Sequence, residues 1–141
     1  MVLEVSGNNL SHIRLQFKNN LSSSSKIYKC LYWGKEHALK KVSIAEGTYT
    51  FRTVMAEFMV LSQVKHPRIV NLITFYQTKN DWNFVLEYMK NGSLRCLMGY
   101  YKKNQYKLNQ NDLLAMFMDV AFGVKYLHSK GIIHRDIKPV N

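Results

Sequence analysis

The sequence has little of what would mark a secreted, membrane-bound or metal-stabilised protein. Its 141 residues include two cysteines, Cys30 and Cys96, and their spacing excludes a disulfide scaffold. No apolar run approaches the roughly 18–20 residues that span a bilayer, and the first ten residues lack the features of a signal peptide. Residue 2 is Val, which excludes myristoylation. The five histidines show no HxxxH spacing, so we expect no structural metal site and a cytoplasmic location.

Acidic residues are also scarce, since 20 Lys and Arg outnumber nine Asp and Glu and give a net charge of +11. Such a balance can indicate binding to nucleic acid or to another anionic surface. The lysines, however, are spread from Lys18 to Lys138, and the one dense patch is YYKKNQYK at 100–107. Lysines alternating with aromatics can bind stacked bases, but charge runs are usually solvated faces. We therefore favour a solvated helix end over a nucleic-acid site.

Hydrophobic periodicity predicts strands and helices that are largely segregated along the chain. Alternating apolar residues predict strands, whereas apolar residues at intervals of three and four predict helices. A helix beginning after Thr48 or Thr50 ends before Pro67, and Asn111 and Gly131 bound the last helix. This order favours an α+β fold. The predicted strands are 12–17, 26–33, 37–42, 69–76 and 83–89, and the last two helices are 93–103 and 112–130.

The end of the sequence, HRDIKPVN at 134–141, resembles the catalytic loop of protein kinases, H-R-D-L-x-x-x-N. The Lys138–Pro139 pair resembles the serine/threonine branch. The resemblance implies transfer of a phosphoryl group from ATP to a protein hydroxyl. It implies that Asp136 accepts the hydroxyl proton, that Lys138 meets the γ-phosphate and that Asn141 holds Mg²⁺.

Upstream motifs of the same family follow in the expected order. HALKK at 37–41 resembles the third-strand V-A-I-K, which makes Lys40 the phosphate-binding lysine and Ala38 its motif neighbour. Glu57, on the following predicted helix, is its expected partner. FVLEYMKNGSL resembles the strand and hinge that bind adenine. The resemblance assigns Leu86 as gatekeeper, and the backbone of Glu87 and Met89 as contacts of the base.

The phosphate-covering loop departs from its family pattern, G-x-G-x-x-G-x-V. With Ile27 aligned to the Val, the glycine positions hold Asn20, Ser22 and Ser25. Serine adopts positive φ less readily than glycine, so we expect weakened nucleotide binding. Asn20 is the mildest change because Asn tolerates the left-handed region.

The resemblance divides the chain into an N-terminal extension (1–12), a small lobe with hinge (13–89) and the start of a large lobe (90–141). It predicts a five-stranded antiparallel sheet with one helix, followed by the first large-lobe helices. D-F-G and the activation segment do not follow Asn141, so we expect the chain alone to be inactive. The last helix is apolar on more than one side, and we expect its exposed surface to need a partner or the rest of the domain.

Two other functions are compatible with these residues. A pseudokinase or truncated regulatory module could keep Lys40 and Glu57 for shape and bind a partner protein. The serine-rich loop favours that alternative, whereas intact Asp136, Lys138 and Asn141 oppose it. Nucleic-acid binding depends on charge and the 100–107 patch alone. We expect a protein substrate, phosphorylated on Ser or Thr, and no membrane partner.

Overall fold

The computed structural model describes residues 14–20, 25–43 and 50–140, and for residues 14–20 it describes the backbone only. The chain divides into two compact units. The sheet unit extends to Gln63 and also includes Val70–Tyr88, and the helical unit comprises Val64–Ile69 and the chain from Met89 onward. The elements are β1 (Arg14–Asn20), β2 (Ser25–Tyr32), β3 (Lys35–Ser43), α1 (Phe51–Gln63), β4 (Leu72–Gln77), β5 (Asp81–Glu87), α2 (Leu94–Lys103) and α3 (Gln110–Ser129).

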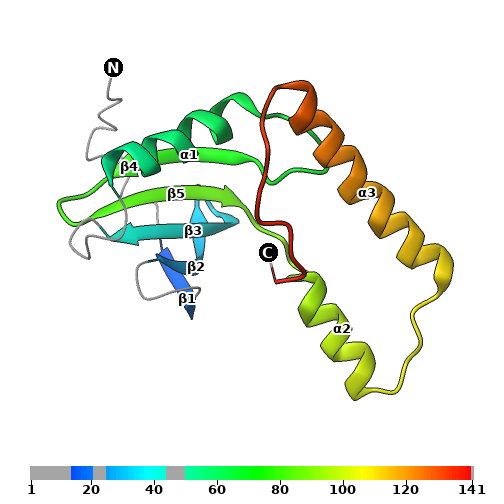
Figure 1. Ribbon diagram of the computed structural model, residues 1–141. Coiled ribbons are helices and arrows are strands. Elements are labelled where there is room, and N and C mark those ends of the chain that lie inside the picture. The colour runs from blue at the N-terminus through cyan, green and yellow to red at the C-terminus, as the bar shows by residue number, and fades with distance from the viewer. Residues whose placement is uncertain (1–13, 21–24, 44–49, 141) are drawn as a thin grey trace. The chain divides into compact units, whose positions relative to one another are not determined.

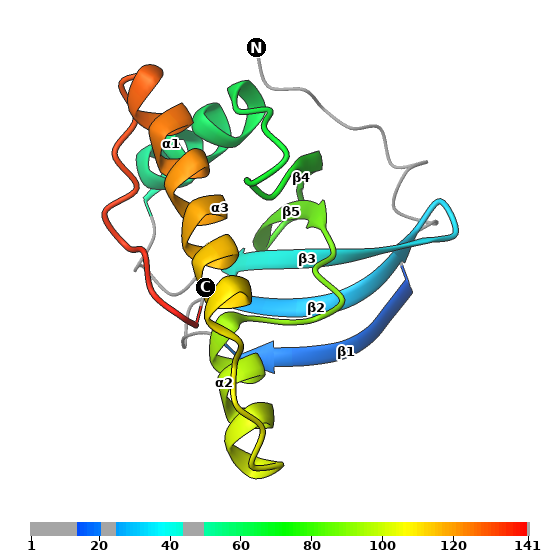
Figure 2. The same cartoon turned by 90° about the vertical axis from the view of Figure 1, so that its right-hand side faces the viewer.

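The sheet unit is built on five strands in the order β1-β2-β3-β5-β4 (Figure 2). The predicted meander is present, because β1 pairs antiparallel with β2 and β2 antiparallel with β3. β5 pairs with β3 and places β4 at the edge. In this register Lys40 lies opposite Phe84, and Ala38 lies opposite Leu86. Directly opposite residues share a face of the sheet, so the register decides which side chains can meet.

Helix α1 lies along one face of this sheet (Figure 1). Thr50 precedes its first residue, and the Thr50 carbonyl accepts hydrogen bonds from Thr53 N and Val54 N at 3.0 and 3.2 Å. Of the two predicted cap residues, Thr48 lies outside the described residues. The buried residues of this face are Val42, Val54, Trp82 and Phe84, and Met55, Phe58, Leu61, Leu72, Phe75 and Leu86 pack against them.

The opposite face of the sheet carries a second buried cluster, formed by Cys30, Leu39, Tyr76 and Val85. Burial raises the pKa of Cys30 to about 11 and, as the main cause, that of Tyr76 to about 12. Both groups are therefore neutral at physiological pH. Their role on this face is packing.

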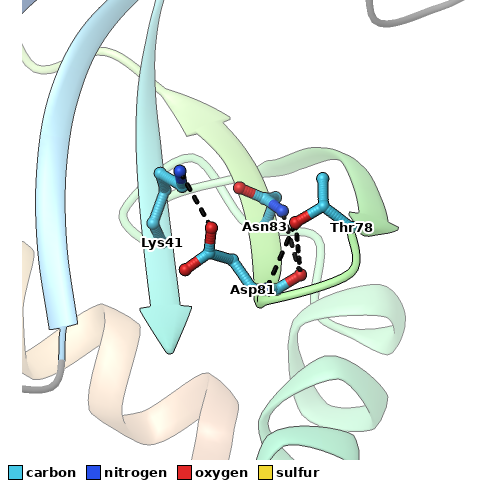
Figure 3. Close-up of polar contacts among 4 residues, drawn as sticks. All are labelled: Lys41, Thr78, Asp81 and Asn83. Carbon is cyan, nitrogen blue, oxygen red and sulfur yellow. Dashed lines mark hydrogen bonds and ion pairs between the residues drawn. The ribbon is translucent and has the colours of Figure 1, made fainter. Parts of the chain in front are cut away.

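A polar network closes the turn between β4 and β5 (Figure 3). The Asp81 carbonyl accepts from Thr78 N at 2.8 Å, from Thr78 Oγ1 at 3.2 Å and from Asn83 Nδ2 at 3.1 Å. Lys41 Nζ lies 3.0 Å from Asp81 Oδ2 and ties the turn to β3. Asn83 is 1% exposed, so its amide needs this partner inside the sheet.

The helical unit begins its helices with side-chain caps. Ser93 caps α2, with its Oγ accepting from Cys96 N at 3.4 Å, and Asn109 caps α3, with its Oδ1 accepting from Asn111 N at 3.0 Å. The prediction that Asn111 caps the last helix was wrong, because the capping oxygen comes from Asn109, two residues earlier. Gly131 ends the α3 region as predicted, with φ of 71° and its N–H on the His128 carbonyl.

Residues 64–69 pack on α3 within the helical unit. Arg68 Nε lies 2.8 Å from Asp119 Oδ1, and the His66 ring stacks on Tyr126 with centroids 4.9 Å apart. At Gly123 an added Cβ would lie 3.1 Å from the Arg68 carbonyl oxygen, so glycine permits the close approach of this loop. These contacts explain why the C-terminal half of α3 is the better buried half.

The rest of α3 is largely exposed. Of the predicted apolar stripe, Leu127 is buried, whereas Phe117 is 65% and Val120 47% exposed. Leu114 and Phe122, which flank the stripe, are also exposed.

Strand β4 begins at Leu72 and not at residue 69 as predicted, because Ile69 N bonds the His66 carbonyl in a turn. The elements confirm the α+β fold expected from a kinase-like small lobe followed by the first large-lobe helices.

Candidate functional site

Lys40 and Glu57 form an ion pair that joins the sheet to α1. Lys40 Nζ donates to Glu57 Oε1 at 2.6 Å, and the two side chains are 19% and 32% exposed. Lys40 reaches the helix because Lys40 and the buried Val42 share the face of β3 that α1 covers. Its Nζ also lies 5.8 Å from the centre of the Phe84 ring. The pair therefore holds a partly buried ammonium in one place.

Three other predicted nucleotide-binding residues share this face of the sheet. Ile27 lies directly opposite Lys40 on β2, and Ala38 is two residues before Lys40 on β3. Leu86 lies opposite Ala38 on β5 and packs against the core under α1. Opposite residues and residues two apart on a strand point to the same side. The register thus groups apolar side chains from three strands around one cation.

The predicted phosphate-loop residues are placed less fully. Asn20 is the last residue of β1 and lies opposite Lys26, with only its backbone described. Ser22 lies outside the described residues. Ser25 is the first residue of β2, lies opposite Val42 and is 5% exposed. At this position Ser25 belongs to the paired strand and not to a free loop.

The predicted hinge follows directly from β5. Glu87 N donates to the Asn71 carbonyl at 2.9 Å, and Glu87 Oε2 accepts from Asn71 N and Nδ2 at 3.3 and 3.1 Å. Met89 is 45% exposed, and its carbonyl accepts from Gly92 N at 3.0 Å. A carbonyl oxygen has two lone pairs, so Met89 retains acceptor capacity. Because the Glu87 carboxylate already bonds Asn71, a ligand at the predicted hinge would be recognised by backbone groups.

The predicted catalytic loop lies in the helical unit, after α3. Lys138 Nζ lies 2.8 Å from Asp136 Oδ2, with the two side chains 47% and 63% exposed. Asp136 N donates to His134 Nδ1 at 3.2 Å. Arg135 has φ of 63°, a left-handed conformation that is uncommon for residues other than glycine. Asn141, the predicted Mg²⁺ ligand, lies outside the described residues.

Three residues that take part in this arrangement had no role assigned to them from the sequence. Asn71 bonds the Glu87 carboxylate, His134 Nδ1 accepts from Asp136 N, and Phe84 lies beneath the Lys40 ammonium. The HRD motif already contained His134 and was the available signal. Asn71 and Phe84 stand in ordinary strand contexts, and only the strand register makes their positions apparent.

The part of the chain that the structure describes contains neither a metal-binding cluster nor a helix suited to cross a membrane. No group of three or more His, Cys, Asp or Glu side chains is placed to hold a metal ion within residues 14–20, 25–43 and 50–140. Among the helices in that part of the chain, none is long and apolar enough to cross a membrane.

Comparison with known proteins gives a consistent family assignment. The sequence pattern described as "Protein kinase domain" matches residues 22–141. The chain is 32% identical over 137 residues to serine/threonine/tyrosine-protein kinase HT1 of Arabidopsis thaliana, covering 94% of this chain and 35% of that protein. It is 36% identical over 110 residues to serine/threonine-protein kinase DCLK2 of Mus musculus, covering 78% of this chain and 14% of that protein.

Cell division control protein 7 of Schizosaccharomyces pombe is 37% identical over 109 residues, which cover 77% of this chain and 10% of that protein. The chain thus spans about a third or less of the length of each of these relatives. The family pattern, by contrast, extends over most of the chain and includes Lys40, Glu57 and the HRD loop. The chain therefore belongs to the protein kinase domain family.

Proposed function

We propose that this chain is part of a protein kinase that transfers the γ-phosphoryl group of ATP to serine or threonine hydroxyls of proteins. The ion pair between Lys40 and Glu57, at 2.6 Å, is the observation that carries the proposal. A lysine that is held by a partner and partly screened from water is suited to bind phosphate oxygens in a fixed geometry. The printed names of the relatives support serine and threonine as acceptors, and one relative is also named for tyrosine.

The nucleotide fits the sheet unit on chemical grounds. Ile27, Ala38 and Leu86 offer an apolar surface on the same face as the Lys40 ammonium. A flat base can pack on such a surface while the cation binds the phosphates. Because the carboxylate and the N–H of Glu87 both bond Asn71, Glu87 would contact the base edge through its carbonyl, and Met89 through its N–H and carbonyl. When bound, ATP supplies the phosphoryl group that is transferred.

In the catalytic loop, Asp136 orients the acceptor hydroxyl and takes its proton as the new bond to phosphorus forms. The Lys138 ammonium lies 2.8 Å from Asp136 Oδ2 and can stabilise the negative charge of the transferred phosphoryl group beside it. Asn141 is the residue of this chain that would hold Mg²⁺ through its amide oxygen. The Lys138–Pro139 pair, which resembles the serine/threonine branch, supports serine and threonine as acceptors.

Nucleotide-dependent thermal stabilisation tests this proposal on the chain itself. A ligand that binds only the folded state at one hundred times its Kd adds about 2.7 kcal/mol of stability. We expect Mg·ATP to raise the melting temperature of the unmodified chain. The substitution Lys40→Met should weaken binding by roughly tenfold to a hundredfold, because it removes a charge-assisted bond to phosphate.

Lys41→Met is the matched control for this experiment. Lys41 neighbours Lys40 on β3, and its ion pair with Asp81 has a similar partial exposure, at 30% and 23%. It points to the other face of the sheet, so Lys41→Met should keep the ATP-induced shift. If the unmodified chain shows no shift at millimolar ATP, the proposal fails and a non-catalytic binding module is favoured. An equal shift in Lys40→Met would remove Lys40 from the nucleotide site.

A further inference from the structure

The segment between β5 and α3 contains no acidic residue. After Glu87 the next carboxylate is Asp112, and the positive charges between them are Lys90, Arg95, Lys102, Lys103 and Lys107. The proposed phosphoryl transfer accounts for none of these residues. Lys102 and Lys103 are in the last turn of α2 and Lys107 follows four residues after it, so the segment concentrates charge of one sign at one place in the helical unit.

Three tyrosine rings pack against one another at the same end of α2. The ring centres of Tyr100, Tyr101 and Tyr106 lie 6.1 Å apart in each pairing, with interplanar angles of 54° to 76°. Tyr106 returns to the helix because Gln105 has φ of 56° and Tyr106 N donates to the Tyr101 carbonyl at 2.9 Å. The turn is fixed by its backbone, and Tyr100 and Tyr106 are nevertheless 57% and 59% exposed.

Among the residues that the structure describes, the surrounding lysines have no acidic partner. Lys102, Lys103 and Lys107 are exposed, and none forms an ion pair with another residue in the described part of the chain. The negative end of the helix dipole favours Lys102 and Lys103 in the last turn. It does not account for Lys107, beyond the helix, or for the exposed rings. We name these six residues, Tyr100, Tyr101, Lys102, Lys103, Tyr106 and Lys107, the Tyr–Lys surface.

This surface is linked to the catalytic loop through α2. Arg95 N, in the first turn of α2, donates to the Pro139 carbonyl at 2.7 Å, and Pro139 follows Lys138. The ten residues of α2 rise about 15 Å from that bond to the Tyr–Lys surface. An extended polypeptide covers this distance in about five residues. One substrate could therefore contact the surface and present a hydroxyl to the loop.

We propose that the Tyr–Lys surface docks acidic segments of the protein substrates, at least about five residues from the phosphorylated hydroxyl. The substrate role rests on the proposed kinase function. Carboxylates complement the ammonium groups and accept hydrogen bonds from tyrosine hydroxyls, and tyrosine gives a rigid contact area at low entropic cost. Two of the three ring pairs meet edge to face and the third is tilted, so the rings are not parallel platforms for successive bases, which favours a polypeptide over single-stranded nucleic acid.

Fluorescence anisotropy of a labelled peptide of alternating Glu and Ser tests the proposal on the full chain. We compare Lys102→Gln/Lys103→Gln/Lys107→Gln with the control Lys65→Gln/Lys79→Gln/Lys125→Gln, which changes the net charge equally at exposed positions. Loss of three exposed ion pairs should weaken peptide binding by about tenfold. The control should weaken it by less than about twofold, because it leaves the three lysines of the Tyr–Lys surface in place. A peptide of Gln and Ser should not bind.

Two results would overturn the docking proposal. Equal weakening in both triple variants would show that net charge alone attracts the peptide. Binding of single-stranded oligo-dT that depends on the three lysines, without binding of the acidic peptide, would assign the surface to nucleic acid. Mg·ATP stabilisation is measured in parallel. If Mg·ATP does not stabilise the chain but the peptide still binds through the three lysines, the kinase function fails and the acidic-peptide surface stands. If Mg·ATP stabilises the chain but the peptide does not bind, the docking proposal fails and the kinase function stands.

Discussion

The sheet unit and the helical unit bury their apolar residues to very different extents. Of ten buried apolar side chains among the described residues, eight lie in the sheet unit, and Val64 and Leu127 are the two in the helical unit. Phe84 in β5 is fully buried, whereas Phe117 in α3 is 65% exposed. Both units have regular apolar patterns in the sequence. The difference shows that a pattern identifies an apolar face but not what covers it.

Replacing one phenylalanine in each unit is the strongest test of this contrast. Phe84→Ala should lower the free energy of unfolding by about 3–5 kcal/mol, because it removes a fully buried ring and leaves a cavity. Phe117→Ala should change it by less than about 0.5 kcal/mol, since most of that ring already contacts solvent. Urea denaturation measures both changes by circular dichroism and by the fluorescence of Trp33 and Trp82, which both belong to the sheet unit.

A large loss of stability in Phe117→Ala would contradict the comparison. It would mean that the apolar face of α3 is covered in solution, by a second molecule or by another protein. The concentration dependence of the transition would then distinguish association between copies from a property of the single chain.

The β4–β5 turn offers a test of polar interactions within the sheet unit. Thr78→Val removes the hydroxyl that donates to the Asp81 carbonyl at 3.2 Å and accepts from Asp81 N at 3.2 Å (Figure 3). We expect a loss of about 1 kcal/mol in the free energy of unfolding, the usual net value of such a bond. Thr74→Val, on β4, is the control, because no side-chain hydrogen bond of Thr74 is found among the described residues. Equal losses in the two variants would refute a role of the network.

Much of the sheet unit was predictable because its patterns are local. Alternation in β2 and β3 and the apolar spacing of α1 all indicated elements that the structure contains. Boundaries were predicted less well where a single local hydrogen bond decided them. Asn109 and not Asn111 caps α3, and the turn at Ile69 delays β4 to Leu72.

The candidate site also has a part that the sequence predicted and a part that it did not. The motifs predicted Lys40 and Glu57, and the structure brings the two side chains together. The sequence alone did not indicate the hydrogen bonds between Asn71 and Glu87, because they depend on the pairing of residues distant in the chain. The left-handed conformation of Arg135 was equally unforeseen, since no glycine marks it. Sequence motifs predicted candidate residues, whereas the pairing of strands distant in the chain determines which of their side chains meet.

The two cysteines differ in burial in the same way as the units that contain them. Cys30, in the sheet unit, is fully buried, and its pKa is raised to about 11 by burial. Cys96, on α2, is exposed, and its pKa is lowered chiefly because the Ser93 hydroxyl donates to Sγ at 3.4 Å. Alkylating reagents react with the thiolate. Iodoacetamide should therefore modify Cys96 in the folded chain, and Cys30 only after denaturation.

Removing the Ser93 hydroxyl gives the smallest effect that we predict. Without its hydrogen bond the pKa of Cys96 rises, so Ser93→Ala should slow alkylation roughly two- to fivefold near neutral pH, where less thiolate remains. Because Cys96 is ionised well above pH 9 both in the unmodified chain and in Ser93→Ala, its alkylation rates in the two chains should converge there. Ser93→Thr keeps a hydroxyl and a helix cap, and should retain the faster rate. Mass spectrometry of quenched samples measures each rate, and an unchanged rate in Ser93→Ala would show that exposure alone distinguishes the two cysteines.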